Sequence, residues 1–90
     1  MSPGRDFQEE GFLDFLSFER GLSPRTLSAY RRDLAAFLEF LEDRGVSQPG
    51  SVGPDDLRHY TYQLKERGLA PSSIRRAQSA LRTYFGFLLV

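Results

Sequence analysis

The 90-residue sequence contains no cysteine, a single histidine and no long apolar run. The absence of cysteine excludes a disulfide framework and every thiolate metal site, and it is compatible with a reducing cytoplasm. No uninterrupted apolar stretch, residues 87–90 included, approaches the roughly 20 residues that a membrane-spanning helix needs. We expect no signal peptide ahead of the predicted fold. We therefore expect a soluble cytoplasmic domain that does not associate with a membrane.

Motifs for catalysis or metal binding are also scarce. With no cysteine, a metal site would need carboxylates besides His59, which we interpret as an ordinary helix residue. The acidic pairs Glu9-Glu10 and Asp55-Asp56 fall in predicted first turns of helices, where carboxylates complement the helix dipole. No tyrosine forms a recognised catalytic motif with a histidine, and no glycine-rich phosphate loop follows a strand. We expect no catalytic residue, no metal ion, no cofactor and no small-molecule substrate.

The net charge is zero, but the charges are segregated along the chain. Residues 1–19 hold one basic residue against five acidic ones. Residues 21–34 hold three arginines against one aspartate, and residues 68–90 hold three arginines and no acidic residue. A local basic surface therefore matters more than the sum of the charges.

The sequence contains an internal repeat. Residues 20–41, RGLSPRTLSAYRRDLAAFLEFL, recur 47 positions later as residues 67–88, RGLAPSSIRRAQSALRTYFGFL. In each copy a glycine that can adopt the left-handed conformation ends one helix, and a proline opens the next. Ser23 is expected to cap the first of these long helices, whereas Ala70 gives the second a weaker cap. Such self-similarity indicates that one structural unit is used twice.

The spacing of apolar residues predicts four helices: about residue 6 to 21, 24 to 44, 54 to 68, and 71 to at least 88, with a loop at 46–53. No segment alternates with period two, so we expect no sheet. The predicted fold is all-α, a four-helix bundle made of two helical hairpins. The residues that we assign to its core are Phe7, Phe12, Leu13, Phe15, Leu16, Phe18, Leu27, Tyr30, Leu34, Phe37, Leu38, Leu41, Leu57, Tyr60, Tyr62, Leu64, Ile74, Ala77, Leu81, Tyr84, Phe85 and Leu88.

On the second and fourth helices, the side opposite the apolar stripe carries arginines and otherwise small side chains. Arginine can contact phosphates or guanine edges, serine and threonine can bond phosphates, and alanine leaves room against a thymine methyl group. These sides therefore favour DNA contact, although a solvated arginine face is the alternative. The residues concerned are Arg25, Ser28, Ala29, Arg32 and Ala36 on the second helix, and Ser72, Arg75, Arg76, Ser79 and Thr83 on the fourth.

Two stretches resemble the N-terminal core-binding domain of the tyrosine recombinases, especially the Xer-type enzymes. In residues 22–45 the resemblance rests on Leu22-Ser23, Thr26, Tyr30, Asp33-Leu34, Phe37 and Phe40-Leu41. In residues 69–88, which resemble the closing helix of that domain, it rests on the run Ser79-Ala80-Leu81-Arg82. Together the two stretches and their surroundings cover essentially the whole chain.

The resemblance implies a SAM-like domain that clamps one face of a DNA duplex with its second and fourth helices in the major groove. A separate catalytic C-terminal domain, absent from this chain, would hold the other face. Ala70 departs from the serine that is usual in the family, which removes one cap or phosphate contact. The DNA contacts that the resemblance implies are Arg25, Thr26, Ser28, Ala29 and Arg32, followed by Ser72, Arg75, Arg76 and Ser79.

We therefore expect residues 1–90 to be the non-catalytic DNA-binding domain of a site-specific recombinase that acts in DNA integration, recombination and chromosome dimer resolution. Its partners would be a double-stranded half-site and other recombinase protomers, four of which assemble on two sites. The apolar residues 87–90 indicate a chain that continues. Isolated, the domain should bind DNA weakly and in a salt-dependent way. A SAM-like protein-interaction module, and a phage, integron or transposon integrase as the parent, stay open as alternatives.

Overall fold

The computed structural model describes residues 7–88, and the regular structure in this range is helical. The elements are α2 (Glu9–Phe18), α3 (Pro24–Asp43), a short 3-10 helix η1 (Pro49–Ser51), α4 (Pro54–Glu66) and α5 (Pro71–Leu88). The all-α prediction is confirmed, and the predicted helix ends differ by only a few residues. The predicted start at residue 6 and the apolar residues 89–90 lie outside the described range.

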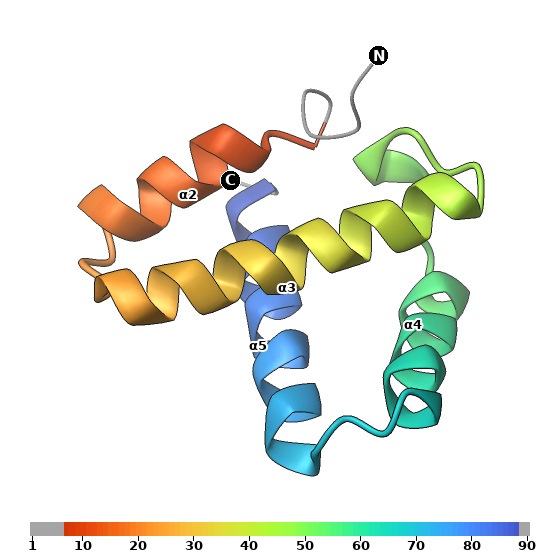
Figure 1. The fold of residues 1–90 in the computed structure, drawn as a ribbon. Coiled ribbons are helices and arrows are strands. Elements are labelled where there is room, and N and C mark those ends of the chain that lie inside the picture. The colour runs from red at the N-terminus through yellow and green to blue at the C-terminus, as the bar shows by residue number, and fades with distance from the viewer. Residues whose placement is uncertain (1–6, 89–90) are drawn as a thin grey trace.

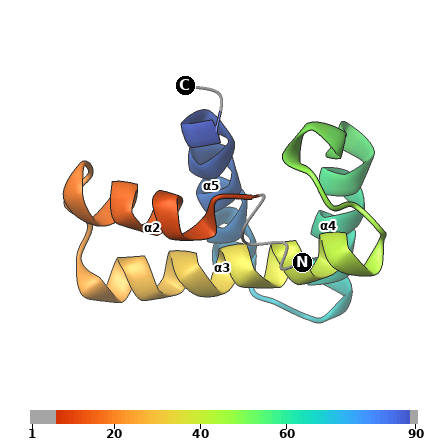
Figure 2. The same cartoon turned by 90° about the horizontal axis from the view of Figure 1, so that it is seen from above.

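The helices form two antiparallel hairpins that cross. The first pairs α2 with α3, the second pairs α4 with α5, and α3 crosses α5 steeply (Figure 1). Figure 2 shows α3 along one side of the molecule, with α2, α4 and α5 on its other side. The N-terminal end of α5 therefore lies near the side of the molecule that α3 forms. The C-terminal end of α5 packs against α2, where Phe87 contacts Phe12 and Phe15.

The turns that open the long helices follow from local chemistry. Gly21 and Gly68 have φ angles of 59° and 78°, the left-handed conformation that the repeat predicts. After Gly21, the side-chain oxygen of Ser23 accepts a hydrogen bond from the backbone N–H of Thr26 at 3.2 Å, so the predicted cap is confirmed. Position 70 has no side-chain acceptor, and α5 begins without this bond.

The core lies where the four helices meet. Its aromatic rings make edge-on contacts, with 5.2 Å between the ring centroids of Phe12 and Tyr84 and 5.1 Å between those of Phe37 and Tyr60. Most of the predicted core residues are buried. The largest fully buried side chains are Tyr84, Phe7, Phe12, Phe37, Leu16, Leu34 and Leu41.

The core prediction was wrong for three residues, which are exposed. Phe18 is 83% exposed, Tyr62 is 60% exposed, and Leu57 is also exposed. Phe18 and Tyr62 each follow a buried residue, Leu16 and Tyr60, by two positions. Because two residues turn a helix by about 200°, the later side chain of each pair faces away from the core.

Candidate nucleic-acid interface

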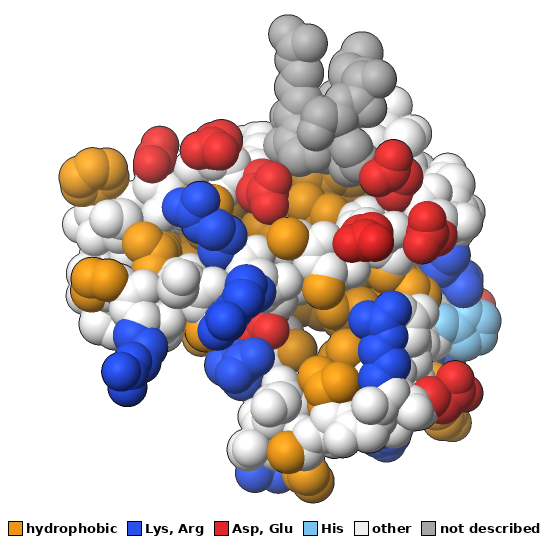
Figure 3. Space-filling view, viewed as in Figure 1, with side chains coloured by type: hydrophobic (Ala, Val, Ile, Leu, Met, Phe, Trp, Pro, Cys, Tyr) orange, Lys and Arg blue, Asp and Glu red, His pale blue; other side chains and the backbone are white. Residues whose placement is uncertain are grey.

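Exposed arginines gather on the side of the molecule that α3 covers. In Figure 3, basic side chains lie over α3 and the N-terminal part of α5. Acidic side chains lie along the upper edge of the same view, over α2 and the C-terminal end of α3. The segregation of charge along the sequence is thus also a segregation in space, and it produces a basic surface on a chain of zero net charge.

The α3 part of this surface consists of alternating long and short side chains. Arg25, Ser28 and Arg32 are exposed, and Ala29 is half-buried between them. Thr26 is half-buried because it belongs to the helix cap: its hydroxyl oxygen accepts a hydrogen bond from Ser23 at 3.0 Å. Within residues 7–88, no carboxylate lies within salt-bridge distance of Arg25 or Arg32.

The α5 part begins in the first turn of that helix. Ser72 and Arg75 are exposed, and Arg75 has no carboxylate partner in the described part of the chain. Ser79 is half-buried, and its backbone carbonyl accepts a hydrogen bond from the hydroxyl of Thr83 at 3.0 Å. Ser72 and Arg75 are therefore more accessible than Ser79.

Arg76 has a carboxylate partner that the sequence did not reveal. Its Nε donates to Oδ2 of Asp33 at 2.9 Å, and its Nη2 donates to Oδ1 at 3.0 Å. Asp33 is only 9% exposed. The hydrogen bond and the negative charge of Asp33 raise the pKa of Arg76 above its ordinary value. This bidentate pair joins α3 to α5 within the basic surface, over a sequence separation of 43 residues.

The single histidine takes part in a cluster that joins the end of α3 to the start of α4. Arg44, the residue after α3, donates through Nε to Oδ1 of Asp56 at 2.9 Å, and its Nη1 lies 2.8 Å from Nδ1 of His59. Asp56 also accepts a hydrogen bond from the backbone N–H of Gly53 at 2.9 Å, and this bond is the largest cause of its lowered pKa. We interpret the cluster as structural. Residues 7–88 contain no group of three or more His, Asp or Glu side chains that could hold a metal ion.

The buried tyrosines are held in their neutral form. Burial, with the negative charge of Asp33 adding to it, raises the pKa of Tyr60 to about 12. Burial also raises the pKa of Tyr84, whose hydroxyl donates to the backbone carbonyl of Phe7 at 2.7 Å. Neither hydroxyl is placed to act as a nucleophile at neutral pH.

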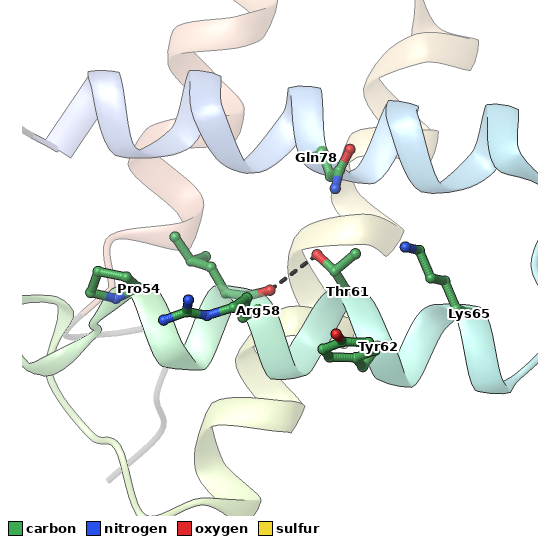
Figure 4. Close-up of a pocket in the computed structure, with 7 residues that line it drawn as sticks. Pro54, Arg58, Thr61, Tyr62, Lys65 and Gln78 are labelled. Carbon is green, nitrogen blue, oxygen red and sulfur yellow. Dashed lines mark hydrogen bonds between the residues drawn. The ribbon is translucent and has the colours of Figure 1, made fainter.

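A groove between α4 and α5 opens away from the basic surface. It has a volume of about 420 Å³, and Figure 4 shows Gln78 of α5 facing Thr61 of α4 across it, with α3 behind. The hydroxyl of Thr61 donates a hydrogen bond to the backbone carbonyl of Leu57 at 3.0 Å. The residues that line the groove include no carboxylate and no histidine, so it offers neither an acid–base pair nor metal ligands.

Comparisons with known proteins show the family of the chain. Residues 10–90 match the family described as phage integrase, N-terminal SAM-like domain. A tyrosine recombinase XerC of Herpetosiphon aurantiacus is 40% identical over 81 residues, which are 90% of this chain and 26% of that protein. A tyrosine recombinase XerD of Chlorobaculum tepidum is 41% identical over 80 residues, 89% of this chain and 26% of that protein.

A tyrosine recombinase XerD of Oceanobacillus iheyensis is 34% identical over 85 residues, 93% of this chain and 29% of that protein. The chain thus spans between a quarter and a third of the length of these relatives. No solved structure matches it. No helix in residues 7–88 is long and apolar enough to cross a membrane. Because the family match extends over residues 10–90, the chain belongs to the N-terminal SAM-like domain family of the phage integrases and Xer tyrosine recombinases.

Proposed function

We propose that the chain is the DNA-binding domain of a site-specific tyrosine recombinase, and that α3 and α5 lie against a recombination half-site. The observation that carries this proposal is the pairing of two arginine-bearing helices on one side of the molecule, where most of the acidic side chains lie along the upper edge of the view and Asp33 is paired with Arg76 (Figure 3). A surface of this kind attracts phosphates even though the whole chain is neutral.

The composition of the surface suits close approach to a duplex. Arg25 and Arg32 stand two helical turns apart on α3, so both project from the same side of the helix. Small residues between them let the helix backbone enter a major groove about 12 Å wide. Ser72 lies in the first turn of α5 and Arg75 just after it, near the positive end of the helix dipole, which favours a phosphate.

The remaining parts of the proposal follow from the relatives. Strand exchange would be carried out by a catalytic domain outside these 90 residues, and this chain would be non-catalytic. Its partners would be double-stranded DNA and other recombinase protomers, with four protomers on two sites. The process served would be DNA integration, recombination or chromosome dimer resolution.

The experiment is a fluorescence anisotropy titration of a labelled 20-base-pair duplex with the chain, repeated at several salt concentrations. We expect the logarithm of the association constant to fall linearly with the logarithm of the salt concentration. Arg25→Ala, Arg32→Ala and Arg75→Ala should each weaken binding and reduce the salt slope by about 1. Arg58→Ala is the matched control, because Arg58 lies on α4 and is paired with Asp55.

Two results would refute the proposal. One is the absence of salt-dependent binding at low salt. The other is an equal effect of Arg58→Ala and Arg75→Ala, which would mean that the α5 surface has no special part in binding. Self-association or peptide binding in place of DNA binding would instead favour a SAM-like protein-interaction module.

A further inference from the structure

The two side chains of the Asp33–Arg76 ion pair differ in their exposure. The side chain of Asp33 is 10% exposed, whereas that of Arg76 is 44% exposed. The bidentate contact uses Nε and Nη2 of the guanidinium and two of its five N–H donors. The edge that carries Nη1 makes no contact with a carboxylate in the described residues, so Arg76 is bound on one edge and open on the other.

The place of this pair distinguishes it from the other two ion pairs of residues 7–88. Those pairs, Arg44 with Asp56 and Arg58 with Asp55, lie at or beside α4. Only the Asp33–Arg76 pair joins the two helices of the basic surface. It also places a negative charge among arginines, where simple electrostatics would make that charge unfavourable for DNA binding.

Resting on the proposed DNA-binding function, we propose that Asp33 is a positioning residue for the DNA contact. It holds the guanidinium of Arg76 so that its free edge faces the phosphate backbone, and it fixes the distance between the arginines of α3 and those of α5. An unpaired arginine side chain loses rotamer freedom when it binds a phosphate, and Asp33 removes most of that freedom before DNA arrives.

This role and a purely electrostatic role predict opposite signs for one substitution. Asp33→Asn keeps the shape of the side chain, removes its negative charge and turns one acceptor into an N–H₂ donor that opposes the guanidinium. Electrostatics alone predicts tighter DNA binding, because the chain gains one positive charge. Positioning predicts weaker binding, by about twofold to tenfold, which is the range expected for ordering one long side chain.

The matched control is Glu39→Gln. Glu39 is exposed on α3 and makes no ion pair within the described residues, so its substitution changes the net charge by the same amount without releasing an arginine. We expect Glu39→Gln to bind the labelled duplex as tightly as the unchanged chain or slightly more tightly. All titrations are made at a temperature at which circular dichroism shows every variant to be fully folded, so differences in stability do not enter.

Two substitutions of Arg76 separate its positioning from its contact. Arg76→Lys keeps the charge but cannot form the bidentate pair, so we expect weaker binding with an unchanged salt slope. Arg76→Gln removes the charge, and a direct phosphate contact predicts a slope smaller by about 1. If Asp33→Asn did not fold, Arg76→Lys would carry the test, and wild-type affinity in that variant would overturn the inference.

The inference is also overturned if Asp33→Asn binds as tightly as Glu39→Gln, or if Arg76→Gln leaves the salt slope unchanged. These outcomes differ from a failure of the proposed function. That failure appears in the unchanged chain as a lack of salt-dependent DNA binding, before any variant is measured.

Discussion

Replacing Tyr84 by phenylalanine isolates one buried hydrogen bond that ties the start of the fold to its last helix. Tyr84 and Phe7 are both completely buried, and the hydroxyl of Tyr84 donates to the backbone carbonyl of Phe7 at 2.7 Å. The ring of Tyr84 also packs edge-on against Phe12, with 5.2 Å between the centroids. Tyr84→Phe removes the hydroxyl and keeps the ring, so the packing contact remains.

The magnitude follows from the carbonyl that is left behind. In Tyr84→Phe the oxygen of Phe7 loses the hydroxyl donor while it remains out of contact with bulk water, and an unsatisfied buried acceptor costs about 1–3 kcal/mol. In a domain of this size, each kcal/mol lowers Tm by about 4–8 °C. We therefore expect a decrease in Tm of about 4–24 °C.

The assay is thermal and urea unfolding followed by circular dichroism, with Tyr62→Phe as the control. Tyr62 is 60% exposed and makes no hydrogen bond through its hydroxyl within residues 7–88, so its substitution should change the free energy of unfolding by less than about 0.5 kcal/mol. A Tyr84→Phe variant as stable as Tyr62→Phe would show that the bond does not contribute, and would refute the reasoning.

Three further predictions concern the ends of helices. The pKa of Asp56 lies below its ordinary value. The ionised carboxylate therefore stabilises the fold above about pH 4, and this stabilisation is lost as the pH falls further. Asp56→Asn should flatten that part of an acid titration followed by circular dichroism. Ser23→Ala should lower the free energy of urea unfolding by about 1 kcal/mol, because α3 loses its cap. Gly68→Ala should cost about 1–2 kcal/mol in the same assay, because φ is 78° there, whereas Gly50→Ala, at a position without positive φ and with open space for a Cβ, should be nearly neutral.

The helices and turns were predictable from the sequence because local chemistry determines them. The left-handed glycines and the cap at Ser23 depend on residues no more than a few positions away. The inward stripes of α3 and α5 follow from helical periodicity, and most of their members are buried. Agreement between the local signals and the global fold is what makes such a prediction possible.

The exposed aromatic residues show where periodicity fails. Phe18 and Tyr62 are apolar side chains on helices that bury other apolar side chains, and composition alone does not separate them from the core. A strict count of 100° per residue from Leu16 and from Tyr60 would have placed both on the outer face.

The paired state of Arg76 was not predictable in the same way. A helical wheel places Arg76 on the polar side of α5 and Asp33 on the flank of the α3 stripe, but it contains no information on how two helices cross. The contact between them spans 43 residues and exists only after the hairpins have packed. The available sequence signal was that Asp33 is the one acidic residue in the arginine-rich stretch 21–34.

The internal repeat explains why this pair occurs once. At the 47-residue offset, the position equivalent to Asp33 is occupied by Ala80, which is buried, and the position equivalent to Arg76 is occupied by Ala29. Each copy therefore supplies one half of a contact that the other copy cannot repeat. The two copies share their turns and their apolar stripes, which are needed to build a hairpin twice. They differ where the hairpins meet, at the crossing of α3 and α5 that the Asp33–Arg76 pair joins.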